Sequence, residues 1–151
     1  MSSFSVTGDD TIQIAGRVLT NFGDGDVGKV SFPNEKVGVK TGKGGNSVFA
    51  ANAMGQLAEV ILRVLRGSPD DTFLNSLLVL QDSDLPSFPL MDGYVVKRIG
   101  DGQGNVANDT TFLKGGVFTK NVETDSNVEG QTDQALAIYN FKFANSERGT
   151  L

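Results

Sequence analysis

The most constraining feature of this chain is an alternation of apolar and polar side chains in short segments that end in glycine-rich turns. Near the C-terminus, Tyr139, Phe141 and Phe143 alternate with Asn140 and Lys142. A repeat of two residues is the repeat of a β-strand with one buried face. The 19 glycines among 151 residues, against only 4 prolines, suit many tight turns. The sequence therefore predicts a chain built mainly from short β-strands.

Eight segments of the chain have the character of strands. They are residues 10–22, 27–32, 35–41, 47–52, 58–66, 90–99, 110–120 and 135–144. Gly16 interrupts the alternation of the first segment, which indicates a β-bulge at that position. The aromatic side chains of these strands and of the one helix are expected in the core, namely Phe49, Phe73, Phe112, Phe118, Tyr139, Phe141 and Phe143.

Residues 53–66 fit two interpretations. Apolar side chains from Met54 to Leu65 recur at helical spacing, which indicates an amphipathic helix. Residues 59–66 are also rich in branched side chains and apolar on both faces, as in a buried strand. Periodicity alone favours neither interpretation.

A helix start follows immediately at Ser68. Serine is a good N-cap, Pro69 suits the first helical position, and Asp70 and Asp71 complement the positive end of the helix dipole. One apolar face follows, made of Phe73, Leu74, Leu77 and Leu78. The helix is expected to run to about residue 81. Because this start comes directly after Arg66, it favours a strand that ends there.

These elements predict one β-rich domain over residues 1–151. The expected architecture is a β-sandwich or barrel of about eight strands with one flanking α-helix. Residues 1–9 and 145–151 are polar and are expected to be flexible or to form arms that reach another subunit. The sequence shows no internal repeat and no linker of the kind that separates domains.

The composition excludes several kinds of active site. The chain has no histidine and no cysteine, so Ser-His-Asp triads, Cys-His dyads, His/Cys zinc sites and disulfides are excluded. Residues 37–44 fail as a phosphate-binding loop, and residues 101–105 lack the following glycine and glutamate of a calcium loop. Asp24 and Asp26 fit a turn better than a cation site. We expect no catalytic residues, no metal and no cofactor, although a catalytic pair among the carboxylates stays open as an alternative.

Charge is distributed unevenly along the chain, whose net charge is −5. Residues 35–66 sum to +3 and residues 67–96 to −5. The two segments are either solvated faces or complementary patches through which identical subunits associate head to tail. The acidic balance argues against nucleic-acid binding. We also expect a soluble protein without membrane binding, because a secretory signal pattern and a span-length apolar stretch are both missing from the sequence.

Two stretches of this sequence resemble bacteriophage tail tube proteins. The first is DTIQIAGRVLTNFGDG at residues 10–25, an apolar alternation that carries a glycine and leads into a Phe-x-Asp-Gly turn. The second is AEVILRVLR at residues 58–66, which runs directly into GSPDDTFLNSL at residues 67–77. In the family this second stretch is a strand followed by the lone helix. The resemblance covers residues 10–81 and resolves the ambiguous segment as a strand.

The resemblance implies a structural virion protein rather than an enzyme. Tail tube subunits form hexameric rings, in which each subunit gives hairpins to a continuous inner β-barrel, and the rings stack into a channel for DNA ejection. The implied partners are other copies of the chain, the sheath if the tail is contractile, and the tape measure, baseplate and terminator proteins. The implied location is the phage tail, after assembly in the host cytoplasm. A ring of six copies would carry a net charge of −30, which lets DNA pass without being bound.

Two other functions stay open beside this one. The inner tube of type VI secretion shares the architecture of tail tubes. A monomeric β-barrel module that binds a small ligand or glycan belongs to a different class and would keep its subunits separate.

Residues 34–46 are the candidate inter-subunit strip, because they carry Lys36, Lys40 and Lys43 and could reach the acidic segment of an adjacent subunit. The expected contact residues are Asn34, Glu35, Lys36, Lys40, Lys43, Asp70 and Asp71. The alternative is that these lysines are ordinary exposed side chains that keep a loop soluble.

Overall fold

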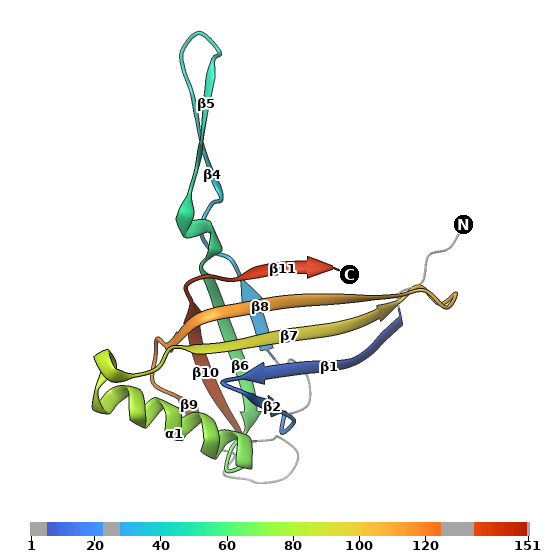
Figure 1. The fold of residues 1–151 in the computed structure, drawn as a ribbon, viewed down its shortest axis with the longest axis vertical. Coiled ribbons are helices and arrows are strands. Elements are labelled where there is room, and N and C mark those ends of the chain that lie inside the picture. The colour runs from blue at the N-terminus through green and yellow to red at the C-terminus, as the bar shows by residue number, and fades with distance from the viewer. Residues whose placement is uncertain (1–5, 23–27, 125–134, 151) are drawn as a thin grey trace.

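The computed structural model describes residues 6–22, 28–124 and 135–150. In these ranges the chain forms eleven strands, one α-helix and two short 3-10 helices (Figure 1). The strands are β1 (Val6–Ile14), β2 (Arg17–Leu19), β3 (Gly28–Ser31), β4 (Val37–Thr41), β5 (Ser47–Ala51), β6 (Ala58–Leu65), β7 (Met91–Gly100), β8 (Val106–Phe118), β9 (Glu123–Thr124), β10 (Leu136–Phe143) and β11 (Glu147–Thr150). The helices are η1 (Ala53–Gln56), α1 (Pro69–Ser83) and η2 (Leu85–Ser87). The expected mainly β fold with one flanking helix is confirmed.

One large antiparallel sheet makes up most of the molecule, in the order β2-β1-β7-β8-β10-β6-β3. Strand β11 pairs with the first half of β8, and β10 pairs with the end of β8, so this 13-residue strand belongs to two arms of the sheet. Figure 1 shows β1, β7, β8 and β11 side by side in one arm, with β6 and β10 at a steep angle to them. The strands β4 and β5 form a separate hairpin that projects away from this body.

The core lies where the two arms and α1 meet. Alternate residues of β6 and β10 are buried there, and Leu74 and Leu78 of α1 pack against them. The rings of Phe118 and Phe141 have centroids 4.7 Å apart. The ring of Phe143 lies directly over Gly116, where a Cβ atom would overlap it. The two-residue repeat of β10 therefore predicted its buried face correctly.

The helix begins as the sequence predicts. The Ser68 hydroxyl accepts a hydrogen bond from the Asp71 backbone N–H at 3.2 Å, and Pro69 is the first helical residue. The helix ends at Ser83, two residues beyond the expected end, and the Gln81 amide forms hydrogen bonds of 2.9 Å to the backbone N–H and carbonyl of Phe118. Within the ambiguous segment, residues 53–56 form η1 and residues 58–65 form the strand β6, as the resemblance indicated for residues 58–66.

Three expectations about local structure need correction. Residues 10–22 form a hairpin rather than one bulged strand, because Ala15 and Gly16 both have positive φ (52° and 83°) and turn β1 back into β2. Phe49 and Phe112 are exposed rather than in the core. Residues 6–9 and 147–150 lie in the two terminal segments that were expected to be flexible or to form arms; they belong to β1 and β11, which pair with β7 and β8. Asp24 and Asp26 lie outside the described residues.

Candidate assembly surfaces

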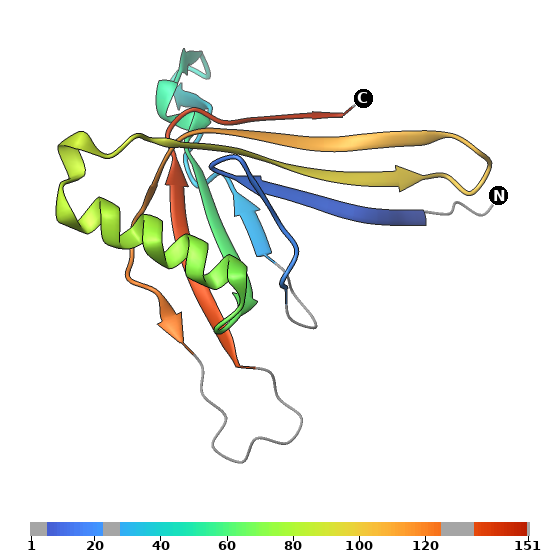
Figure 2. The same ribbon diagram turned by 60° about the horizontal axis from the view of Figure 1, so that its bottom comes forward.

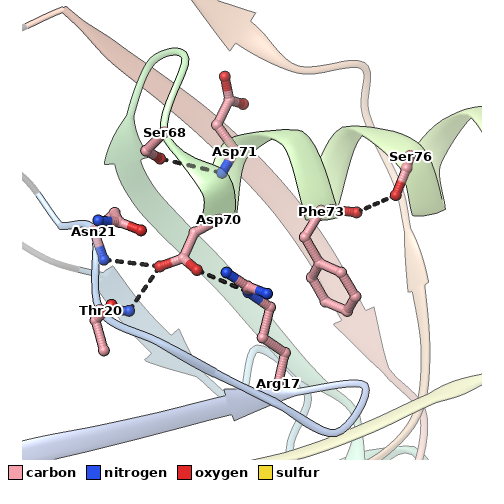
Figure 3. Close-up of polar contacts among 8 residues, drawn as sticks. All are labelled: Arg17, Thr20, Asn21, Ser68, Asp70, Asp71, Phe73 and Ser76. Carbon is pink, nitrogen blue, oxygen red and sulfur yellow. Dashed lines mark hydrogen bonds and ion pairs between the residues drawn. The ribbon is translucent and has the colours of Figure 1, made fainter.

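The first turn of α1 holds a buried carboxylate, that of Asp70 (Figure 3). One oxygen accepts a hydrogen bond from Nε of Arg17 at 2.9 Å. The other accepts from the backbone N–H groups of Thr20 and Asn21 at 2.6 and 2.7 Å. These donors follow the β1–β2 turn and lie about fifty positions away in the sequence. The carboxylate therefore joins the start of the helix to β2 and to the segment that follows it.

The surroundings of Asp70 stabilise its ionised form. Burial alone raises the pKa of a carboxyl group, but here the hydrogen bonds from Asn21, Thr20 and Arg17 outweigh burial and hold the pKa of Asp70 below its ordinary value of 3.8. Asp70 was expected to contact another subunit. That expectation assumed an exposed side chain. The structure shows instead that the Asp70 side chain is buried and hydrogen-bonded inside its own subunit.

The neighbouring Asp71 also makes internal bonds. Its Oδ1 accepts a hydrogen bond from the Tyr139 hydroxyl at 2.6 Å, and its Oδ2 accepts one from the Gly67 backbone N–H at 2.8 Å. Burial and this acidic partner raise the pKa of Tyr139 above its ordinary value of 10.0. The pair joins α1 to β10, so both aspartates at the helix start make tertiary hydrogen bonds that the sequence did not indicate.

The hairpin β4–β5 carries the predicted lysines. Lys40 lies in β4, Lys43 in the turn, and Lys36 just before β4, all exposed. Glu35 is exposed and Asn34 half-buried at the base of the hairpin. The Asn52 backbone N–H donates to the Lys36 carbonyl at 2.7 Å and closes this base. The five residues thus lie in the hairpin or at its base, and Figure 1 shows this hairpin projecting away from α1, whose first turn contains Asp70 and Asp71.

Large apolar side chains accompany these lysines into solvent. Phe49 is 70% exposed, Val48 68% and Val39 54%, and all five residues of β5 are exposed. A two-stranded hairpin is only marginally stable by itself in water, even before such side chains are exposed. We therefore expect that contact with a partner at this hairpin would stabilise the subunit more than contact at its other surfaces.

A second candidate surface is an open cleft of about 460 Å³ between the two arms of the sheet. Its walls come from β1, β7 and β8 on one side and from β3 and β6 on the other. Val30, Phe32 and Val95 give it an apolar lining. At its rim, Arg148 of β11 binds Asp109 of β8 through two hydrogen bonds of 2.8 and 2.7 Å. This ion pair lowers the pKa of Asp109, chiefly through the hydrogen bonds.

Two negative findings concern the described residues. Among them, no group of three or more acidic, histidine or cysteine side chains is placed to hold a metal ion. In that part of the chain, no helix combines the length and the apolar character needed to cross a membrane.

The fold is similar to solved components of contractile injection systems. A chain in the sheath–tube complex of an extracellular contractile injection system, PVC, in its extended state has a TM-score of 0.59 and 11% identity, over 94% of this chain and 88% of that one. A chain in the anti-feeding prophage tube-terminating cap has a TM-score of 0.56 and 8% identity, over 94% and 88%. A chain in the anti-feeding prophage baseplate has a TM-score of 0.55 and 11% identity, over 100% and 97%. No protein-family model and no curated protein sequence matches.

The chain has the fold of these injection-system components. Its resemblance to tail tube proteins is thereby confirmed at the level of the fold, across nearly the whole chain rather than over residues 10–81 alone. Within this fold, sequence patterns located the hairpin lysines but missed Phe49 as a surface residue and Asp70 as a buried one. The exposure of Phe49 left no sequence signal, since alternation along β5 is the same whether or not a partner covers it.

Proposed function

We propose that this chain is the repeating structural subunit of a phage-like tail tube. Copies would form hexameric rings that stack around a central channel, with the sheath, tape measure, baseplate and terminator proteins as further partners. The observation that carries this proposal is the hairpin β4–β5, which holds Val39, Val48 and Phe49 in solvent. Exposed apolar surface of this kind is typical of a site of protein–protein contact.

The form of the sheet supports assembly as well. In the order of the large sheet, β2 and β3 are terminal strands with one paired neighbour each, and β11 extends the first arm beyond β8. Exposed edges invite pairing with other chains unless they are covered. A barrel closed across several subunits removes such edges without requiring one copy to close by itself. The cleft between the two arms would then be covered by a neighbour.

The similar structures support the same role. All three come from assemblies described as a sheath–tube complex, a tube-terminating cap and a baseplate. The net charge of −5 also suits a channel wall, because an acidic lumen does not retain polyanionic cargo. We infer a structural role without catalysis, in a virion tail that ejects DNA.

A second candidate is the tube of an injection system that is not a virion. It is favoured by the similarity to a chain from an extracellular contractile injection system. The subunit would have the same assembly contacts, and only its cargo and the surrounding machine would differ. The type VI secretion tube belongs to this group.

The test is the assembly state of the purified chain and of two matched variants. We expect the wild type to form ring-shaped or hollow tubular particles in negative-stain images at high concentration. Phe49→Ser should abolish them, whereas Val106→Ser, at an exposed position in β8, should not. A 16.0 kDa monomer at all concentrations would contradict the proposal and favour a monomeric ligand-binding module that uses the cleft.

A further inference from the structure

The hairpin β4–β5 has one apolar face. Cross-strand pairing places Val39 opposite Phe49 and Val37 opposite Ala51. Because side chains alternate between the faces of a strand, these four lie on the same side of the hairpin. All four are exposed, so this face is a continuous apolar strip in solvent. We call these four residues the hairpin strip.

A second apolar surface lies at the C-terminal end of α1. Val79, Leu80, Leu85 and Leu90 are each at least half exposed, and they follow one another over the last turn of α1, η2 and the loop before β7. Phe88 is buried beneath them and anchors this segment to the core. We call residues 79–90 the helix-end surface.

The two surfaces carry opposite charge. The hairpin has Lys36, Lys40 and Lys43, and residues 36–52 contain no acidic side chain. The helix-end surface has Asp82 and Asp84, both exposed, and no basic side chain. Asp70 and Asp71 are bonded internally, so the acidic charge of residues 67–96 that faces solvent is concentrated at this end of the helix. Complementary charge favours a correct encounter and disfavours pairing of either surface with itself.

The two surfaces also point in different directions. Figure 1 shows the hairpin at one end of the long axis of the molecule and α1 toward the other end. Figure 2 shows the hairpin foreshortened at the top edge and α1 lying across β6 and β10. One copy therefore cannot bring its own two surfaces together without unfolding. Two copies can do so head to tail, and such a contact between unlike surfaces repeats from copy to copy into a ring or a stack.

We propose that the hairpin strip of one copy docks on the helix-end surface of a second copy. This contact rests on the proposed function, since it names the surfaces through which subunits of the tube would meet. The apolar side chains supply the buried area. Lys40 pairs with Val48 on the opposite face of the hairpin, so Lys40 and Lys43 act through the positive charge they give the hairpin, which attracts Asp82 and Asp84 of the partner copy. The partner that covers the exposed hairpin is thus another molecule of the same chain.

Chemical cross-linking tests the contact directly, because the chain has no native cysteine. The double variant Val39→Cys with Leu85→Cys, treated with a short bis-maleimide, should give a ladder of dimers, trimers and larger species on a denaturing gel. Each single variant alone should stay monomeric, and a mixture of the two should give dimers. Val106→Cys replaces Leu85→Cys as a control of similar exposure, and Lys29→Cys reports on the cleft.

Charge exchange tests the pairing of the two surfaces. Lys40→Glu with Lys43→Glu should reduce cross-linking at least tenfold, and so should Asp82→Lys with Asp84→Lys, each in the double-cysteine chain. A mixture of the two charge-reversed chains should recover it, since each hairpin then meets a surface of opposite charge. Recovery in the mixture also shows that neither variant has simply failed to fold.

The outcomes separate this contact from the proposed function. A ladder from positions 39 and 85 with charge rescue supports the contact. Equal or stronger linkage of position 39 to position 29, to position 106 or to itself overturns it. If wild-type rings or tubes form while positions 39 and 85 do not link, the contact is wrong and the proposed function stands. If neither particles nor links form, both proposals are wrong. If positions 39 and 85 link but no hollow particles form, the contact is supported and the proposed tube is wrong.

Discussion

Replacing Asp70 by asparagine should destabilise the subunit strongly, although this aspartate lies in the first turn of a helix, where an asparagine is usually tolerated. The wild-type carboxylate accepts three hydrogen bonds, from Arg17, Thr20 and Asn21. The amide retains one oxygen for the backbone donors but presents an NH₂ group to the Arg17 guanidinium. A hydrogen bond to a charged group contributes about 1.5–3 kcal/mol. Arg17 is 42% exposed, so water replaces part of its bond, and we expect a net loss of about 2 kcal/mol.

The assay is urea denaturation followed by circular dichroism, at a protein concentration low enough that the midpoint does not depend on it. Asp82→Asn is the matched control, since Asp82 is exposed near the other end of the same helix, and its free energy of unfolding should change by less than about 0.5 kcal/mol.

The difference between wild type and Asp70→Asn should depend on pH. The pKa of Asp70 is lower in the folded state than its ordinary value of 3.8, so the folded state favours the ionised form. Its contribution is therefore present in full above pH 4 to 5 and is lost as the pH falls through the folded-state pKa, below 3.8. We expect the two unfolding curves to converge as the pH falls below the folded-state pKa of Asp70. A loss under about 0.5 kcal/mol at pH 7, or a difference that does not shrink as the pH is lowered through the acidic range, would refute this reasoning.

Three further changes have expected effects on the same unfolding measurement. Tyr139→Phe removes the buried hydroxyl that donates to Asp71, so unfolding should become easier by about 1–2 kcal/mol, and a neutral result would show that this bond contributes nothing net. Gly116→Ala forces a methyl group into an aromatic ring of β10 and should cost about 1–3 kcal/mol, whereas Gly149→Ala, which meets nothing within 4 Å, should cost less than half as much. Ser68→Ala removes the N-cap and should cost about 1 kcal/mol; an unchanged midpoint would contradict the capping role.

Local signals in the sequence predicted the parts of the fold that depend on near neighbours. The start of α1 follows from Ser68 and Pro69, and the buried face of β10 follows from its two-residue repeat. The turn at residues 15–16 was missed, because a glycine that interrupts a strand pattern is typical of a bulge as well as a turn, and positive φ is uncommon at an alanine.

The candidate site could be predicted only in part, for a related reason. The lysines of the hairpin were found from charge alone. The partner of Asp70 is Arg17, 53 residues away in the sequence. Because the helix dipole already explains an aspartate at a helix start, the sequence does not indicate that Asp70 has a tertiary partner. Phe49 was assigned to the core because the pattern of a strand does not show which of its faces the same chain covers.

A cryo-EM reconstruction of particles assembled from the wild-type chain tests most directly whether this subunit is completed by its neighbours. We predict hollow rings or tubes of six subunits per layer, in which Val39 and Phe49 of every hairpin are covered by another copy. Particles whose hairpins project into solvent, or a sample that contains only separate 16.0 kDa chains, would contradict that account.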